Sequence, residues 1–336
     1  MNIFIDRKFE TAYVDHPITL VDVGSSGGLQ DNWKEAERFL KVIGFDADSR
    51  SHEENSQNPK YINLEYGLNN KKGEADFYLT RSKTKSSLYE PNFDFLSKFP
   101  KSDFYEVIGK SVIKCDTLDN QLSGLDIQDV DFIKLDTQGS ELAILEGSEK
   151  ALASSVFGVE VETEFAPMYK NQPLFPEIDS FMRKFGFQLF DLAPCYWKRK
   201  SGRPLGGPQG QLIYADALYL KSGTNLKFII DSFSGAELKK SKVLRVLSIC
   251  FLYGYFDYAL EIFDEFKNLF DKTEAKTIDV YIRIDGQKYQ NSLKFPGQKY
   301  ASPLLYRLWK FLKPRDYNWK RYIYKPGNRG GEFISQ

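Results

Sequence analysis

The stretch that decides the fold is Val21-Asp22-Val23-Gly24-Ser25-Ser26-Gly27-Gly28-Leu29, in which an apolar strand runs into a glycine-rich turn. Gly24 and Gly28 let the backbone approach a ligand closely, because glycine has no Cβ atom. Asp22, at the strand end, can accept hydrogen bonds from loop amides or from a ligand ammonium group. The pattern predicts the strand, turn and helix that begin a doubly wound α/β fold.

A second acid indicates which ligand the turn would hold. Asp46 ends the next apolar run, about where doubly wound folds place the carboxylate that binds ribose hydroxyls. The turn has Ser26 at the middle glycine position of the dinucleotide motif, it has no phosphate-binding lysine, and Asp22 would repel phosphate. S-adenosylmethionine carries an ammonium group and no phosphate, so it fits better than a dinucleotide. The alternative is a purely structural turn.

The hydrophobic pattern outward from this turn predicts βαβ units around a mostly parallel sheet, over residues 18–220. Helices are expected at residues 31–40, 141–152 and 175–185, and an added strand at residues 74–80. Seven strands are expected in the sheet, at residues 18–23, 42–45, 61–66, 131–135, 156–161, 187–190 and 212–220.

The chain changes character near residue 222. Residues 238–270 have apolar side chains at helical spacing, interrupted at Gly254, which predicts a helix pair. We therefore expect a domain of residues 1–221 and a mostly helical C-terminal extension of residues 222–336. The tail, residues 303–330, contains eight basic residues, one acid (Asp316) and many aromatic side chains.

This basic aromatic tail has three interpretations. It could contact a partner or second copy, an anionic membrane or glycolipid surface, or nucleic acid. Pro303, Pro314 and Pro326 interrupt it too often for one long amphipathic helix. An arm that packs back on the main domain is therefore the leading expectation, and the oligomeric state is left open.

Composition excludes several classes of protein. The 336 residues contain 46 basic and 46 acidic side chains, so the net charge gives no reason to expect a nucleic-acid partner. Two histidines, and three cysteines that are far apart in the sequence, lack metal-ligand spacing, so no metal site is predicted. We expect the cysteines to be buried core residues. Without a signal-peptide pattern or a membrane-length apolar run, the sequence predicts a soluble cytoplasmic protein.

A second motif extends the interpretation. Residues 131–147 read Asp-Phe-Ile-Lys-Leu-Asp-Thr-Gln-Gly-Ser-Glu-Leu-Ala-Ile-Leu-Glu-Gly, and they contain the pattern Ile-Lys-x-Asp-x-x-Gly-x-Glu. Together with residues 86–92, 115–119 and 210–218, this motif makes the chain resemble the FkbM-type methyltransferases, over about residues 19–220. The resemblance implies a class I, Rossmann-like α/β fold, with a seven-stranded sheet and helices on both faces. It also implies S-adenosylmethionine as the cofactor.

The resemblance implies which residues surround the cofactor. Those at its methionine end are Asp22, Gly24, Ser25 and Gly28. Those at its adenosine end are Asp46, for the ribose hydroxyls, and Ala47, Gly67 and Leu68, for adenine. Asp136 would face the sulfonium and the methyl acceptor. The family often has Ala-Asn where this chain has Ser25-Ser26.

Methyl transfer needs a base only when the acceptor is a poor nucleophile such as an alcohol. His16 precedes the first strand and His52 lies on the adenosine side, so carboxylates are the better candidates. The candidate catalytic residues are Asp136, Glu160 and Glu162. Glu160, Glu162 and Glu164 share one face of their strand by the alternation of side chains. The alternative is that these glutamates form a solvated edge.

The expected function is transfer of a methyl group from S-adenosylmethionine to a hydroxyl of a glycan or another hydroxylated small molecule. The alternative, from a different class, is a non-catalytic or cofactor-binding scaffold protein of the same fold. In that case the basic tail would engage a partner or an anionic surface.

Overall fold

The computed structural model describes residues 3–24, 28–48, 61–202 and 210–288, together with residues 297, 300–301, 303–305, 307–308 and 320–322 of the tail. Its centre is an eight-stranded sheet in the order β11-β9-β10-β8-β7-β1-β2-β3. These strands are β1 (Ile18–Val23), β2 (Leu40–Phe45), β3 (Tyr61–Leu64), β7 (Phe132–Leu135), β8 (Gly158–Glu164), β9 (Phe187–Trp197), β10 (Gln211–Lys221) and β11 (Lys320–Tyr322).

The direction of the strands sets where the carboxyl ends meet. β1 pairs in parallel with β2 and β7, and parallel pairing continues to β3 on one side and to β8 on the other. β10 is antiparallel to both of its neighbours, β8 and β9. The seven predicted strands and the predicted fold class are confirmed. Because β1, β2, β7 and β8 run in the same direction, the residues that follow them gather at one edge of the sheet.

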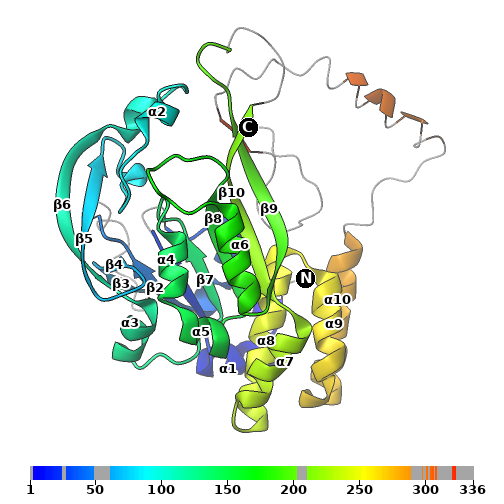
Figure 1. Cartoon of the computed structure of the whole chain (residues 1–336). Coiled ribbons are helices and arrows are strands. Elements are labelled where there is room, and N and C mark those ends of the chain that lie inside the picture. The colour runs from blue at the N-terminus through cyan, green and yellow to red at the C-terminus, as the bar shows by residue number, and fades with distance from the viewer. Residues whose placement is uncertain are drawn as a thin grey trace.

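Helices cover both faces of the sheet, as predicted (Figure 1). Along β1, Ile18 and Leu20 belong to one core and Val21 and Val23 to the other, as side-chain alternation requires. The first core includes η1 (Ile3–Ile5), α1 (Arg7–Asp15), η2 (Asp31–Phe39) and helices of the extension. The second core includes α3 (Leu118–Gly124), α4 (Glu141–Glu146), α5 (Glu149–Ser154) and α6 (Phe175–Lys184).

Three local predictions need correction. Residues 31–39 form the 3₁₀-helix η2 and no α-helix. The helix expected at residues 141–152 is divided into α4 and α5 at Gly147, where a Cβ atom would stand 2.3 Å from the carbonyl oxygen of Asn69. The added strand, β5 (Gly73–Thr80), belongs to a separate sheet of order β4-β6-β5, with β4 (Gly67–Leu68) and β6 (Val107–Asp116).

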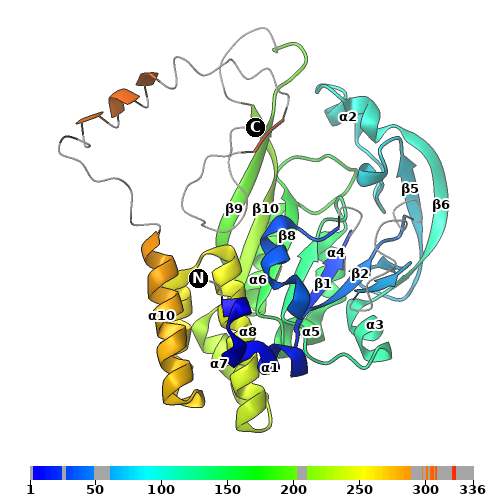
Figure 2. The ribbon, with the colours of Figure 1, turned by 180° about the vertical axis from the view of Figure 1, so that it is seen from behind.

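The C-terminal extension packs on the face that also carries α1, as Figure 2 shows. It consists of α7 (Gly223–Ser232), α8 (Ala236–Tyr253), α9 (Phe256–Phe266) and α10 (Lys272–Lys288), with the 3₁₀-helix η6 (Lys267–Leu269). The predicted interruption is confirmed, because Gly254 ends α8 with φ +80°, a left-handed conformation that suits glycine. No described helix is long and apolar enough to cross a bilayer.

Two further expectations concern the cysteines and the tail. Cys115, Cys195 and Cys250 are all buried and unbonded to one another, as expected. In the tail, β11 pairs in the antiparallel direction with the end of β9. Most of the predicted arm, residues 303–330, lies outside the described residues.

Candidate functional site

The glycine turn begins where three strand ends are joined by backbone contacts. The Gly24 amide donates to the Phe45 carbonyl at 2.8 Å, and the Asp136 amide donates to the Val23 carbonyl at 3.0 Å. Gly24 has φ +82°, and a Cβ atom there would stand 2.0 Å from the carbonyl oxygen of Asp136. A glycine is therefore required at this position. Gly28 also has a positive φ, of +70°, but a Cβ atom there would meet nothing within 4 Å.

Asp22, predicted for the methionine end of the cofactor, is buried beside Lys134. Its Oδ1 atom lies 3.4 Å from Lys134 Nζ. Burial raises the pKa of Asp22, whereas Lys134 lowers it. Burial alone would lower the pKa of Lys134, but Asp22, Asp136 and Glu160 together raise it. Lys134 is thus a buried cation among three carboxylates. The Ile-Lys-x-Asp pattern contains Lys134 but does not by itself predict this role.

The residues predicted for the adenosine end are divided between two places. Asp46 follows β2 at the edge that carries Gly24, and its Oδ1 atom accepts a hydrogen bond of 2.8 Å from the Asp48 amide. Ala47 lies between these two acids and is partly buried. Gly67 and Leu68 are buried in β4, where they pair with β6 in the second sheet. Ser25 lies outside the described residues.

Asp136 and Glu162, two of the three candidate catalytic residues, are joined by Gln138. Gln138 Nε2 donates to Asp136 Oδ1 at 2.8 Å and to Glu162 Oε1 at 2.7 Å. Its Oε1 atom accepts a hydrogen bond of 3.0 Å from Lys85 Nζ and lies 3.2 Å from the hydroxyl of Tyr169. Gln138 is buried and has φ +61°, an uncommon conformation that this network holds in place. Gln138 and Lys85 are not predicted from the sequence.

The electrostatics of this centre favour bound protons or a bound cation. Burial and the neighbouring Asp136 raise the pKa of Glu162 well above its usual value, although Lys85 lowers it. Burial raises the pKa of Glu141 to about 7, against hydrogen bonds from the Thr137 amide and hydroxyl. Glu164 lies at 0% exposure, and burial, Glu141 and Glu162 raise its pKa well above normal. Around Gln138, buried carboxylates therefore outnumber the cationic side chains.

Glu160, the third candidate catalytic residue, has different partners. Its Oε1 atom accepts a hydrogen bond of 3.0 Å from Gln30 Nε2, and its Oε2 atom accepts one of 2.9 Å from the Tyr253 hydroxyl. Burial raises the pKa of Glu160, whereas these two hydrogen bonds and the positive charge of Lys134 lower it. Glu160 is therefore engaged by the glycine turn on one side and by the C-terminal extension on the other.

The three glutamates of β8 do not form a solvated edge. Glu160, Glu162 and Glu164 have 4%, 6% and 0% exposure, because β8 lies between β7 and β10 in the sheet. The alternative of a solvent-facing cap is thus wrong, and polar side chains donate hydrogen bonds to Glu160 and Glu162. Within the described part of the chain, no group of three or more His, Cys, Asp or Glu side chains could hold a metal ion. His52 lies outside that part.

The sheet order and the glycine turn define an α/β fold of the Rossmann-like type, as predicted. Residues 32–189 match the family described as the methyltransferase FkbM domain. The predicted resemblance to the FkbM-type methyltransferases is confirmed over these residues. The match includes Asp46, Asp136, Glu160 and Glu162 and begins after the glycine turn.

Solved structures with similar folds are distant in sequence. The methyltransferase FkbM from Methylobacillus flagellatus KT is 14% identical, with a TM-score of 0.34, over 61% of this chain and 43% of that one. The magnesium protoporphyrin IX methyltransferase from Synechocystis PCC 6803 was solved with bound S-adenosylmethionine. It is 10% identical over 64% of this chain and 76% of that one, with a TM-score of 0.31.

The precorrin-6y C5,15-methyltransferase from Geobacter metallireducens GS-15 is 10% identical over 66% of this chain and 92% of that one, with a TM-score of 0.33. The chain thus spans less than half of the length of the Methylobacillus protein. No curated protein matches the sequence.

Proposed function

We propose that the protein is an S-adenosylmethionine-dependent O-methyltransferase that acts on a hydroxyl of a glycan or another hydroxylated small molecule. The observation that carries this proposal is the pair Asp136 and Glu162, bridged by Gln138 at the carboxyl ends of β7 and β8. Open α/β sheets bind their ligands at this edge. The FkbM domain match supports the same reaction class.

The residues at this edge fit S-adenosylmethionine. Four buried or partly buried carboxylates, Asp22, Asp136, Glu160 and Glu162, lie near two lysines, Lys85 and Lys134. A ligand with a sulfonium and an ammonium group would offset the excess negative charge, whereas a phosphate would be repelled. The missing Cβ atom of Gly24 lets the end of β1 lie against the Asp136 carbonyl, which places Asp136 beside the turn.

The binding residues are proposed on this basis. Asp22, Gly24, Ser25 and Gly28 would hold the methionine end, with Asp22 shared between Lys134 and the ligand ammonium group. Asp46 would accept hydrogen bonds from the ribose hydroxyls, because it follows β2 at the edge of the sheet that carries Gly24. Ala47 and the backbone of Gly67 and Leu68 are proposed for adenine.

S-adenosylmethionine supplies a methyl group that is already activated by its sulfonium. What remains for the protein is to align the acceptor hydroxyl, exclude water and accept the hydroxyl proton. The pair of Asp136 and Glu162 would accept the proton that the acceptor hydroxyl loses as its oxygen takes the methyl group. The proton is assigned to the pair because Gln138 donates a hydrogen bond to both carboxylates. The raised pKa of Glu162 makes its ionised form a stronger base.

The test is methyl transfer from radiolabelled S-adenosylmethionine to a series of monosaccharides and simple polyols. We expect transfer by the wild type and a loss of about 100-fold or more in Asp136→Asn, the scale of general-base catalysis. Asp76→Asn, which changes an exposed acid on β5 that pairs with Lys110, is the matched control and should be unaffected. Undiminished turnover in Asp136→Asn would remove Asp136 from the catalytic assignment.

A further inference from the structure

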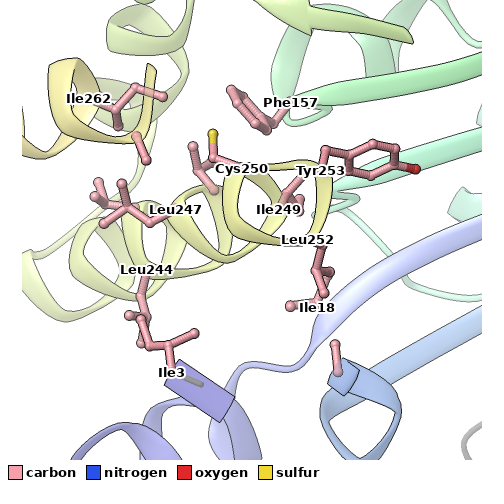
Figure 3. Packing of buried hydrophobic residues seen from close by; sticks show 14 of the residues in the cluster. Ile3, Ile18, Phe157, Leu244, Leu247, Ile249, Cys250, Leu252, Tyr253 and Ile262 are labelled. Atoms are coloured by element: carbon pink, nitrogen blue, oxygen red, sulfur yellow. The ribbon is translucent and has the colours of Figure 1, made fainter. Parts of the chain in front are cut away.

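The last residue of α8 reaches the sheet and touches a carboxylate of the site. Tyr253 has 1% exposure, and its hydroxyl donates to Glu160 Oε2 at 2.9 Å. Its ring stacks on Phe132, with centroids 5.2 Å apart, and meets the edge of Trp33 at 6.0 Å. Figure 3 shows the ring at the end of α8 with its hydroxyl directed toward the strands. The packing of two aromatic neighbours fixes where this hydroxyl lies.

The same carboxylate holds the exit of the glycine turn. Glu160 Oε1 accepts a hydrogen bond of 3.0 Å from Gln30 Nε2, and Gln30 is two residues beyond Gly28. The Gln30 carbonyl accepts a hydrogen bond of 3.0 Å from the Trp33 amide at the start of η2. The entry of the turn is held separately, by the backbone contact of Gly24 with Phe45. Gln30 is therefore the described side chain through which Glu160 acts on the turn.

Glu160 is also linked to the first strand. Its register partner on β7 is Lys134, whose Nζ atom lies 3.4 Å from Asp22. A buried carboxylate that accepts a hydrogen bond on each oxygen has one favoured orientation. Loss of either donor removes one of the two hydrogen bonds that fix this orientation. The orientation of Glu160 thus depends on Tyr253, which lies outside the FkbM match.

We propose that Tyr253 is a positioning residue: through Glu160 and Gln30, the C-terminal extension holds the exit of the glycine turn in the form that binds the cofactor. Tyr253 itself does not touch the cofactor. This assigns Glu160 to positioning instead of proton transfer. The effect on affinity rests on the proposed function, whereas the effect on the turn does not.

The variants are Tyr253→Phe and Gln30→Leu, made in the full chain, and the control is Tyr258→Phe. Tyr258 is also a buried tyrosine of the extension, but its hydroxyl donates to the Lys221 carbonyl, away from the turn. The first measurement is amide hydrogen exchange of residues 28–33 without ligand. The second is isothermal titration with S-adenosylhomocysteine.

We expect Tyr253→Phe to accelerate exchange of residues 28–33 and to weaken S-adenosylhomocysteine binding by about tenfold, within the usual range of coupling between sites. Gln30→Leu should weaken binding similarly, and the double variant should lose little more, because both changes break one relay. Tyr258→Phe should match the wild type in both measurements. Gln30 is only partly buried, so its variant keeps the test valid even if Tyr253→Phe unfolds.

Two outcomes overturn the inference: Tyr253→Phe indistinguishable from Tyr258→Phe in exchange and affinity, or fully additive losses in the double variant. In either case, a wild type that binds S-adenosylhomocysteine leaves the proposed function standing. Conversely, accelerated exchange of the turn in Tyr253→Phe supports the positioning role even if the wild type binds no S-adenosylhomocysteine, a result that would contradict only the proposed function.

Discussion

The carbonyl oxygen of Asp136 occupies the place that a side chain at Gly24 would need, since a Cβ atom on Gly24 would stand 2.0 Å from it. The first and the fourth strand of the parallel core in chain order, β1 and β7, are thus in contact through backbone alone where both end. The candidate catalytic acid is therefore placed directly against the turn proposed to hold the cofactor.

This contact predicts that Gly24→Ala is far more damaging than Gly28→Ala. At both positions alanine must adopt a left-handed backbone, which costs about 1–2 kcal/mol, but only at Gly24 does it also collide with the Asp136 backbone. Urea unfolding should show a loss beyond that range for Gly24→Ala and within it for Gly28→Ala. Equal losses in the two variants would mean that β1 and β7 are less closely apposed.

Asp46→Ala should weaken S-adenosylmethionine binding by at least about tenfold, which corresponds to about 1.4 kcal/mol. The reason is the loss of charge-assisted hydrogen bonds to the ribose hydroxyls. Isothermal titration measures the effect, and Asp76→Ala, a change to an exposed acid on the second sheet, should leave affinity unchanged. An unaltered affinity in Asp46→Ala would show that the ribose lies elsewhere.

Glu162→Gln should make the protein more stable than the wild type at neutral and alkaline pH. A carboxyl group whose pKa is raised by folding binds more protons when folded, so its contribution to stability falls as pH rises above the ordinary value of 4.5. Glutamine keeps the shape and removes this penalty, at the expense of methyl transfer. Urea unfolding from pH 5 to pH 8 should show an advantage of the variant that grows with pH.

The control for this prediction is Glu106→Gln, which changes an exposed carboxylate that pairs with Arg81. Its stability relative to the wild type should vary little over the same range. A Glu162→Gln advantage that is constant with pH, or that shrinks as pH rises, contradicts the raised pKa of Glu162.

Lys242→Met should destabilise the protein by about 3 kcal/mol, because it breaks a buried ion pair and leaves Asp129 and Asp131 to share Arg245. Lys242, on α8, has no exposed side-chain surface, and its Nζ atom lies 2.6 Å from both Asp129 and Asp131, next to the start of β7. Lys227→Met, which breaks an exposed pair with Glu265, should cost about 1 kcal/mol or less. Similar small losses in both variants would indicate that the extension is not anchored to the sheet through this ion pair.

Much of the fold follows from local patterns. Short apolar, β-branched runs predict the seven strands, because this signal is local in the sequence. The division of α4 from α5 could not be predicted, since Gly147 is required by the approach of Asn69, 78 residues earlier. The placement of β5 in a second sheet likewise depends on its pairing with β6. The division between residues 1–221 and 222–336 stays a prediction, and the two parts share one hydrophobic core.

The site is predictable only in part. Asp46 and Asp136 are predicted as site residues because each directly follows a predicted strand. The glutamates of β8 are predicted because side chains alternate between the two faces of a strand. Gln138 could not be recognised, because its importance comes from a left-handed backbone and from Glu162 on another strand. Tyr253 reaches Glu160 from 93 residues away in the sequence. Such partners depend on tertiary packing.

Cofactor binding is measured by isothermal titration of the full wild-type chain with S-adenosylmethionine. The buried acid centre and the glycine turn predict saturable binding with one ligand per chain, and proton release on binding, because a cation lowers the pKa of the nearby carboxyl groups. Titrations in two buffers of different ionisation enthalpy measure the protons released. No binding at millimolar ligand would contradict the enzyme proposal and favour a scaffold protein of the same fold.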